Sequence, residues 1–208
     1  MTSHPGQGPP PKPTDWNIPN ALTVLRILLV PVYGWLLLYD DGVHPWLRFW
    51  AWAVFVTAAV TDGVDGKIAR SRGQITNFGK IADPIADKAL TGMAFIGLSL
   101  LGVIWWWVTI VILVRELGIT VLRFVVIRHG VMPAGRGGKL KTMLQTVSLA
   151  ALTFPLWVLP LHEVWRWVAY GILGAALIIT VVSGIDYVFK ALHVRRSSER
   201  TARRSARG

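Results

Sequence analysis

The sequence predicts an all-α membrane protein with six transmembrane helices, and three observations lead to that prediction. Hydrophobic residues make up 53% of the 208 residues and charged residues only 16%, against roughly one quarter charged in soluble domains. Eleven tryptophans are present, and such rings often gather at the two interfaces of a membrane. Six apolar segments divide the chain, each near the ~20 residues that a helix needs to cross a bilayer.

Taken in order, these segments cover about 21–39, 46–64, 84–101, 105–127, 143–159 and 165–189. Helices are expected because in hydrocarbon a helix satisfies its own backbone hydrogen bonds. Residues 1–14, rich in Pro and Gly, are predicted to be disordered. Residues 15–192 are predicted to form the membrane domain. Residues 193–208 form a basic tail, expected to rest on anionic lipid or to lack regular structure.

Positive charge is distributed unevenly over the connections between these segments. Loops 65–82 and 128–141 and the C-terminal tail are rich in Lys and Arg, whereas the connections near 40–41, 102 and 161–163 carry neither. The positive-inside rule then predicts a multi-pass protein of the cell membrane with both termini and both long loops in the cytoplasm. The net charge of +11 comes from residues that flank apolar segments, so no nucleic-acid partner is expected; membrane lipids are.

Four aspartates lie where the second apolar segment gives way to the third. Asp62 and Asp65 are three residues apart, and Asp83 and Asp87 are four apart, so each pair shares one face if the segments are helical. Pro84 is expected in the first turn of the third helix. A short loop would bring both pairs together at the cytoplasmic boundary, where four anions repel one another and need a positive counter-charge.

Carboxylate oxygens bind hard cations, so magnesium, manganese or calcium is expected at this cluster. The chain has no cysteine, which excludes thiolate metal sites and thiolate catalysis. Two ions sharing the carboxylates suit phosphoryl chemistry, because one polarises a phosphate and the other activates a hydroxyl. The alternative is that the aspartates merely pair with neighbouring Lys and Arg; it suits one isolated pair better than four acids at membrane depth.

The stretch has the form D-x-x-D-G-x-x-A-R, eight residues, then G-x-x-x-D-x-x-x-D. This pattern resembles the signature of the CDP-alcohol phosphatidyltransferase family, and the resemblance extends over about 17–190. It implies a six-helix membrane fold, a homodimer, and an enzyme whose active site faces the cytoplasm. The implied reaction moves a phosphatidyl group from CDP-diacylglycerol to an alcohol and releases CMP.

The resemblance also implies roles for individual residues. Asp62, Asp65, Asp83 and Asp87 would hold two divalent ions, Mg²⁺ or Mn²⁺. Asp87 would in addition take the proton from the attacking hydroxyl. The residues expected to contact CDP-diacylglycerol are Asn20, Thr23, Gly66, Arg70 and Thr76.

Three further segments, at 17–32, 115–124 and 135–142, resemble the bacterial phosphatidylglycerophosphate synthases within this family. They imply sn-glycerol 3-phosphate as the acceptor, and a phosphorylated acceptor needs cationic groups. The candidates are Arg115, Arg123, Lys139 and Lys141.

Two of these assignments have a simpler alternative. Arg115 could form a salt bridge with its neighbour Glu116 or with a motif aspartate. Lys139 and Lys141 could anchor a helix end at the interface. Arg26, one turn into the first segment, could extend its side chain to the interface or face the acceptor pocket.

Other functions fit parts of the pattern. A cardiolipin synthase of the same family would use phosphatidylglycerol as acceptor, and a phosphatidylinositol phosphate synthase would use an inositol phosphate. A cation transporter would also place carboxylates at membrane depth, but it would spread them along several helices. A metal-stabilised scaffold without chemistry would tolerate loss of Asp87.

Overall fold

The computed structural model describes residues 18–71, 77–126 and 137–205, with side chains for 20–61, 79, 82–122 and 138–189. These residues form six α-helices and two short 3₁₀ turns and contain no strand, which confirms the all-α prediction. The elements are α1 (Ile18–Leu38), η1 (Tyr39–Gly42), α2 (Pro45–Ser71), α3 (Asn77–Leu100), α4 (Trp106–Val126), α5 (Gly137–Thr153), η2 (Leu156–Val158) and α6 (His162–Ser205). The predicted disordered segment 1–14 lies outside the described residues.

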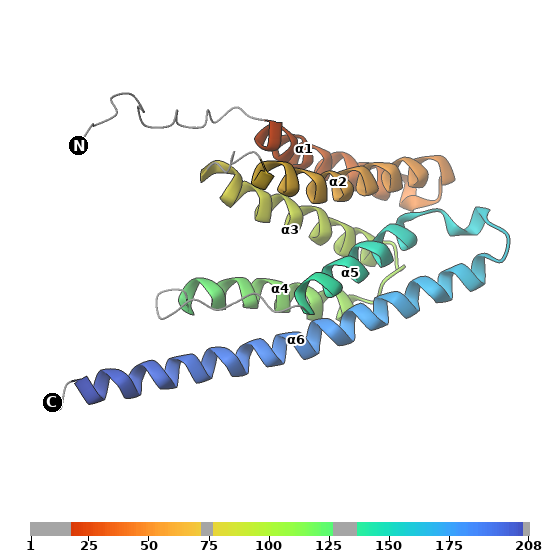
Figure 1. Ribbon diagram of the computed structural model, residues 1–208. Helices are drawn as coiled ribbons and strands as arrows, with labels where there is room; N and C mark the ends of the chain where they lie inside the picture. Colours follow the sequence, from red (N-terminus) through yellow and green to blue (C-terminus); the bar gives the residue numbers. More distant parts are fainter. Residues whose placement is uncertain (1–17, 72–76, 127–136, 206–208) are drawn as a thin grey trace, which may run out of the picture.

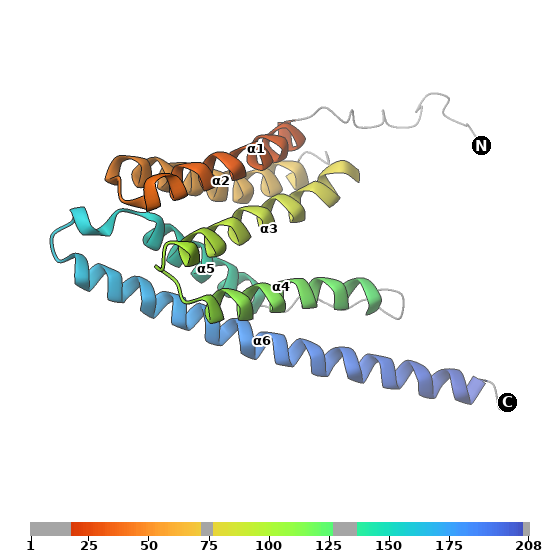
Figure 2. The same ribbon diagram turned by 180° about the vertical axis from the view of Figure 1, so that it is seen from behind.

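The helices form two groups that are joined by α5. In Figure 1, α1, α2 and α3 lie together in one half of the molecule, and α4 and α6 lie in the other. α1 packs against both α2 and α3, and α6 packs against α4 and α5. α5 also contacts α2 and α3, and the reverse view in Figure 2 shows it between the two groups. Through these contacts α5 connects the aspartate-bearing helices to α6, and α3 also contacts α4 directly.

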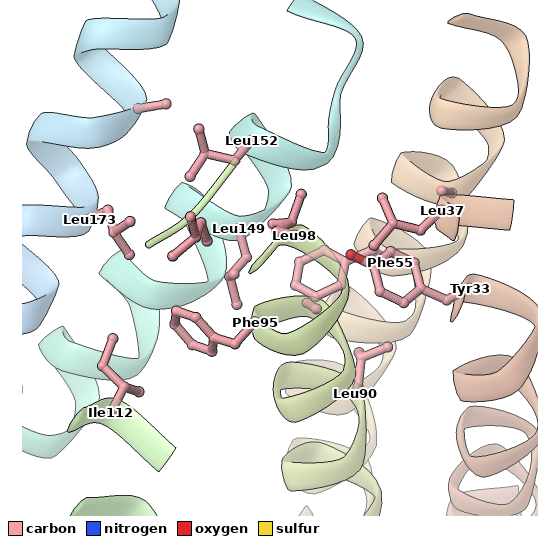
Figure 3. Packing of buried hydrophobic residues seen from close by; sticks show 14 of the residues in the cluster. Tyr33, Leu37, Phe55, Leu90, Phe95, Leu98, Ile112, Leu149, Leu152 and Leu173 are labelled. Carbon is pink, nitrogen blue, oxygen red and sulfur yellow. The ribbon is translucent and has the colours of Figure 1, made fainter. Parts of the chain in front are cut away.

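The interior is built from apolar side chains that recur at helical spacing. Leu90, Ala94 and Leu98 follow one face of α3 at intervals of four residues and are at most 3% exposed. They meet Phe55 of α2 and Leu149 of α5 in one continuous cluster (Figure 3). Close packing of this kind fixes the rotation of each helix and therefore the direction of its polar residues.

The helix exteriors are more apolar than parts of the interior. In α1, Thr23 and Arg26 are 1% and 2% exposed, whereas Leu28 and Trp35 are 60% and 59% exposed. This reverses the usual arrangement of a soluble helix, and exposed apolar surface on this scale suits a lipid environment. Two described helical segments, Asn20–Gly42 and His162–Phe189, are long and apolar enough to cross a membrane. Six spans and the orientation of the termini stay predictions.

α3 begins earlier than the sequence predicted. It starts at Asn77, and Pro84 lies inside it, so the prediction that Pro84 occupies the first turn is wrong. The reason is that the helix continues past the apolar segment into the preceding polar residues. Because proline has no N–H, it cannot donate to the carbonyl of Lys80, as an ordinary residue at this position of a helix would.

The last two helices also differ from their predicted bounds. α5 ends at Thr153 rather than near residue 159, because Pro155 disfavours a helical conformation at the residue before it. The short turn η2 then completes the predicted apolar segment. α6 continues to Ser205, so the described part of the basic tail is helical rather than irregular.

Arg48 of α2 closes the C-terminal end of α5. Its side chain is buried; Nε donates to the carbonyl oxygen of Thr153 at 2.9 Å and Nη2 to that of Leu152 at 2.7 Å. The last carbonyls of a helix have no partner within the helix, so the guanidinium satisfies two of them. It also lies 5.2 Å from the ring centroid of Trp157. These contacts join the start of α2 to α5, whereas Asp62 and Asp65 lie toward the other end of α2.

Candidate active site

The four motif aspartates lie on two successive helices whose near ends are separated only by residues 72–76. Asp65 lies six positions before the end of α2 at Ser71, and Asp83 lies six positions after the start of α3 at Asn77. At about 1.5 Å per residue, both therefore lie roughly 9 Å from the connection. The side chains of Asp62 and Asp65 lie outside the described residues, as do those of Gly66, Arg70 and Thr76.

α1 contributes a direct contact to this region. The hydroxyl of Thr23 donates a hydrogen bond to Oδ1 of Asp83. Thr23 and Asn20, which lie one turn apart on α1, are 1% and 5% exposed. The structure thus brings Thr23, which the family resemblance assigned to the nucleotide, to a motif aspartate. Arg26 follows on the same face and is buried, which disfavours the alternative that it extends to the interface and leaves open the alternative that it faces the acceptor pocket.

The donor groups of this region fit a divalent cation. Asp83 is exposed and Asp87 is partly buried, so both carboxylates can be reached from outside the helix bundle. Their oxygens are the ligand type that magnesium and manganese prefer. The described side chains contain no group of three or more possible metal ligands, because two of the four aspartates fall outside them. The ligand set of four aspartates stays a prediction.

Thr23→Val is expected to reduce kcat/KM for CDP-diacylglycerol about tenfold. Valine keeps the shape of threonine but removes the donor to Asp83, and a hydrogen bond to a charged group contributes about 1.5–3 kcal/mol. Initial rates of CMP release over a range of CDP-diacylglycerol and magnesium concentrations measure the effect. Thr23→Ser keeps the hydroxyl and should remain close to wild type. Equal rates for the valine and serine variants would show that the contact has no role in the reaction.

A second polar cluster lies where α3, α4, α5 and α6 meet. Oε1 of Glu116 on α4 accepts hydrogen bonds from Nζ of Lys141 on α5 and, at 3.1 Å, from Nη1 of Arg115. Nη2 of Arg115 donates to Ser183 Oγ on α6 at 2.8 Å. Lys88 of α3 donates to the carbonyl oxygen of Glu116 at 3.2 Å. The salt bridge between Arg115 and Glu116 that the sequence allowed is therefore present.

The four predicted acceptor-phosphate residues do not all join this cluster. Arg115 and Lys141 do, through the shared carboxylate of Glu116. Lys139 is exposed, since two residues along a helix correspond to about 200° of rotation and Lys141 points inward. The side chain of Arg123 lies outside the described residues.

Lys141 is held in an environment that disfavours its charge. Its side chain is 6% exposed, and it lies just before the apolar segment that begins near residue 143. Burial lowers the pKa of the Lys141 ammonium below its ordinary value, while the hydrogen bond and the charge of Glu116 act in the opposite direction. The contact with Glu116 therefore favours the charged form of Lys141.

Comparison with known proteins decides the family. The family model described as CDP-alcohol phosphatidyltransferase matches residues 16–183. The chain belongs to the CDP-alcohol phosphatidyltransferase family. The match contains all four motif aspartates and the whole Glu116 cluster, and it ends within α6, before the helix continues to Ser205.

Several curated CDP-alcohol phosphatidyltransferase relatives cover most of the chain. The chain is 51% identical over 176 residues to a probable phosphatidylglycerophosphate synthase of Mycobacterium tuberculosis (strain H37Rv), covering 85% of this chain and 82% of the relative. It is 35% identical to the CDP-diacylglycerol--glycerol-3-phosphate 3-phosphatidyltransferase of Bacillus subtilis, and the match covers 88% of this chain and 99% of that relative. It is also 31% identical to a CMP-forming cardiolipin synthase of Streptomyces coelicolor, covering 74% of each chain.

Sequence reasoning did not single out two residues of this polar cluster. Lys88 follows Asp87 directly and reaches α4, where it donates to the hydroxyl of Thr120 as well as to Glu116. Glu116 was considered only as a partner of Arg115, although it also binds Lys141. The available signal was that both are ionisable residues inside otherwise apolar segments, which by default are functional candidates.

Proposed function

We propose that this chain transfers the phosphatidyl group of CDP-diacylglycerol to sn-glycerol 3-phosphate, giving phosphatidylglycerophosphate and CMP. The observation that carries the proposal is the 51% identity, over 85% of the chain, to a relative named for this product. The 35% identical relative from Bacillus subtilis, of which 99% is covered, is named for the same two substrates. The full aspartate signature between Asp62 and Asp87 supports the same chemistry.

The donor half of the site is assigned to the aspartates and to α1. Members of the family generally use divalent metal ions. Asp62, Asp65, Asp83 and Asp87 would hold two such ions, Mg²⁺ or Mn²⁺, which would offset the charge of the pyrophosphate. Thr23 fixes the carboxylate of Asp83 through its hydrogen bond. The further residues proposed to contact the nucleotide are Asn20, Gly66, Arg70 and Thr76.

Asp87 is proposed to act as the base. It would accept the proton of the acceptor hydroxyl as the oxygen attacks the phosphorus next to the lipid, and CMP would leave with the electrons of the broken P–O bond. Its position on α3, followed directly by Lys88, supports this role because Lys88 reaches the Glu116 cluster. The proposed proton acceptor is therefore followed on α3 by a lysine that contacts the cluster containing Arg115 and Lys141, the cations proposed for the phosphate.

The acceptor half is assigned to the cationic side chains. Arg115 and Lys141 are proposed to bind the phosphate of sn-glycerol 3-phosphate, since both are largely buried and share one carboxylate. Arg offers a planar fork for phosphate oxygens and Lys a compact charge. Lys139 and Arg123 remain proposed contributors from the ends of α5 and α4.

The setting proposed for this reaction is a membrane. Two candidate spans and membership of a family of integral membrane enzymes support a membrane location. Six spans, cytoplasmic termini, an active site facing the cytoplasm and a homodimer are part of the proposal.

The decisive experiment measures CMP release by the purified protein in detergent with CDP-diacylglycerol and magnesium. The acceptors sn-glycerol 3-phosphate, myo-inositol 1-phosphate, serine and phosphatidylglycerol are each supplied alone. Release only with sn-glycerol 3-phosphate is expected. Release with another acceptor and not with this one would overturn the substrate and keep the family.

Phosphatidylglycerol is the second candidate acceptor, because one relative at 31% identity is named as a CMP-forming cardiolipin synthase. The lower identity and the buried cation Lys141 make it the weaker candidate. Phosphatidylglycerol carries no phosphate monoester that would require such a cation.

A further inference from the structure

One carboxylate lies among three cationic side chains at the junction of four helices. Lys141 and Arg115 both contact Oε1 of Glu116, and Lys88 contacts the carbonyl oxygen of the same residue. Among the described side chains, the cluster thus combines three cationic groups with one anionic group. The excess of positive charge in these contacts is opposite in sign to that of a phosphate monoester.

The buried cation of this cluster, Lys141, is costly to leave without an anion. The side chain of Lys141 is only 6% exposed, and a buried charge that loses its partner costs several kcal/mol. In the free protein Glu116 supplies that partner. The Glu116 side chain is 25% exposed and that of Arg115 is 17% exposed, so a small anion arriving from outside can reach both.

The side chain of Arg115 packs against Gly184 of α6, where a larger residue would crowd it. A Cβ built at Gly184 of α6 would lie 3.1 Å from Cγ of Arg115 and 3.2 Å from its Nε. The Nε atom is buried and has no hydrogen-bond partner among the described residues. The guanidinium is therefore held on one side by Ser183 and Glu116 and retains an unused donor.

We propose that Glu116 is an internal competitor for the acceptor's phosphate and thereby a specificity-determining residue. Its carboxylate occupies Lys141 and Arg115 in the free protein and gives way when a phosphate dianion binds. The inference rests on the proposed acceptor site. A doubly charged phosphate interacts more strongly with these cations than one carboxylate does, whereas an uncharged alcohol cannot replace it.

Glu116→Gln tests this directly, because the amide keeps the shape and removes the competing charge. The free state then loses its counter-ion while the phosphate-bound state keeps one. Inorganic phosphate should protect the variant against thermal unfolding at a concentration at least about fivefold lower than the concentration that protects wild type. KM for sn-glycerol 3-phosphate should fall by a similar factor, with KM for CDP-diacylglycerol unchanged.

Two variants serve as controls. Glu163→Gln removes an exposed glutamate that pairs with Arg166 on α6, and it should leave phosphate protection as in wild type. Lys141→Met removes the principal cation and should abolish phosphate protection. If Glu116→Gln does not fold, Glu116→Asp draws the carboxylate back by one methylene, and it should lower the protective phosphate concentration about twofold.

An unchanged or higher protective phosphate concentration in the Glu116 variants would overturn the inference. The phosphate arm does not depend on the identity of the acceptor. Stronger phosphate protection in Glu116→Gln, together with no CMP release from wild type supplied with sn-glycerol 3-phosphate, would overturn the proposed acceptor and leave the competition intact.

Discussion

Asp87→Asn is expected to lower the rate of CMP release by about 10³-fold or more. The amide cannot accept the proton of the attacking hydroxyl, and general-base catalysis contributes about 10²–10⁴-fold. The same change removes one of the four carboxylates proposed to hold the divalent ions, which adds to the loss. Asp87 is only partly buried and asparagine has nearly its shape, so the variant should fold. Initial rates at saturating CDP-diacylglycerol and acceptor measure the effect.

Asp41→Asn is a matched control for this change. Asp41 is exposed in η1 with φ of 53°, a left-handed conformation that asparagine tolerates well. Its rate should equal that of wild type within about twofold. If Asp87→Asn retained more than about a tenth of the wild-type rate, Asp87 would not be the base, since general-base catalysis alone is worth more.

Arg48→Ala is expected to lower the free energy of unfolding by about 3 kcal/mol. The substitution removes two hydrogen bonds from a charged donor and leaves the carbonyls of Leu152 and Thr153 without that donor in a buried place. It also removes the contact with the ring of Trp157. Thermal unfolding of the purified protein in detergent should show a transition several degrees lower than in wild type.

The controls for Arg48 separate its buried contacts from its charge. Arg48→Lys keeps the charge but lacks the planar guanidinium that donates to two carbonyls. Its unfolding transition should lie between those of wild type and Arg48→Ala. Arg166→Ala removes an exposed arginine from its pair with Glu163, and it should change stability by less than about 1 kcal/mol. A transition for Arg48→Ala as high as that for Arg166→Ala would show that closing α5 contributes little.

Much of the fold could be predicted from the sequence because long apolar segments in a chain poor in charge leave few alternatives to helices. The residues at which those helices begin and end could not be predicted. Apolar composition marks the part of a helix that suits lipid, whereas a helix ends where backbone geometry changes, as at Pro155 after α5. The start of α3 at Asn77 lies in a polar stretch with no strong terminal signal.

For the candidate site too, one part could be predicted from the sequence and another part could not. The aspartate pattern is local, so Asp83 and Asp87 could be selected from spacing and resemblance. The Glu116 cluster depends on how α3, α4 and α5 are rotated against one another, and core residues such as Phe95 set that rotation. No pattern along the chain distinguishes Lys141, which points inward, from Lys139, which does not.

Pro84 lies between the two motif aspartates of α3 and leaves one backbone hydrogen bond of this helix unmade. On one side, Asp87 shares an unbroken run of backbone hydrogen bonds with Leu90 and Leu98, which are anchored in the core. On the other side, the carbonyl of Lys80 lacks the donor that Pro84 cannot supply. Bending at this turn is therefore opposed by one backbone hydrogen bond fewer than elsewhere in the helix. A change in the spacing between Asp83, which is bonded to Thr23 of α1, and Asp87 is expected to cost less than the same change in a helix without proline.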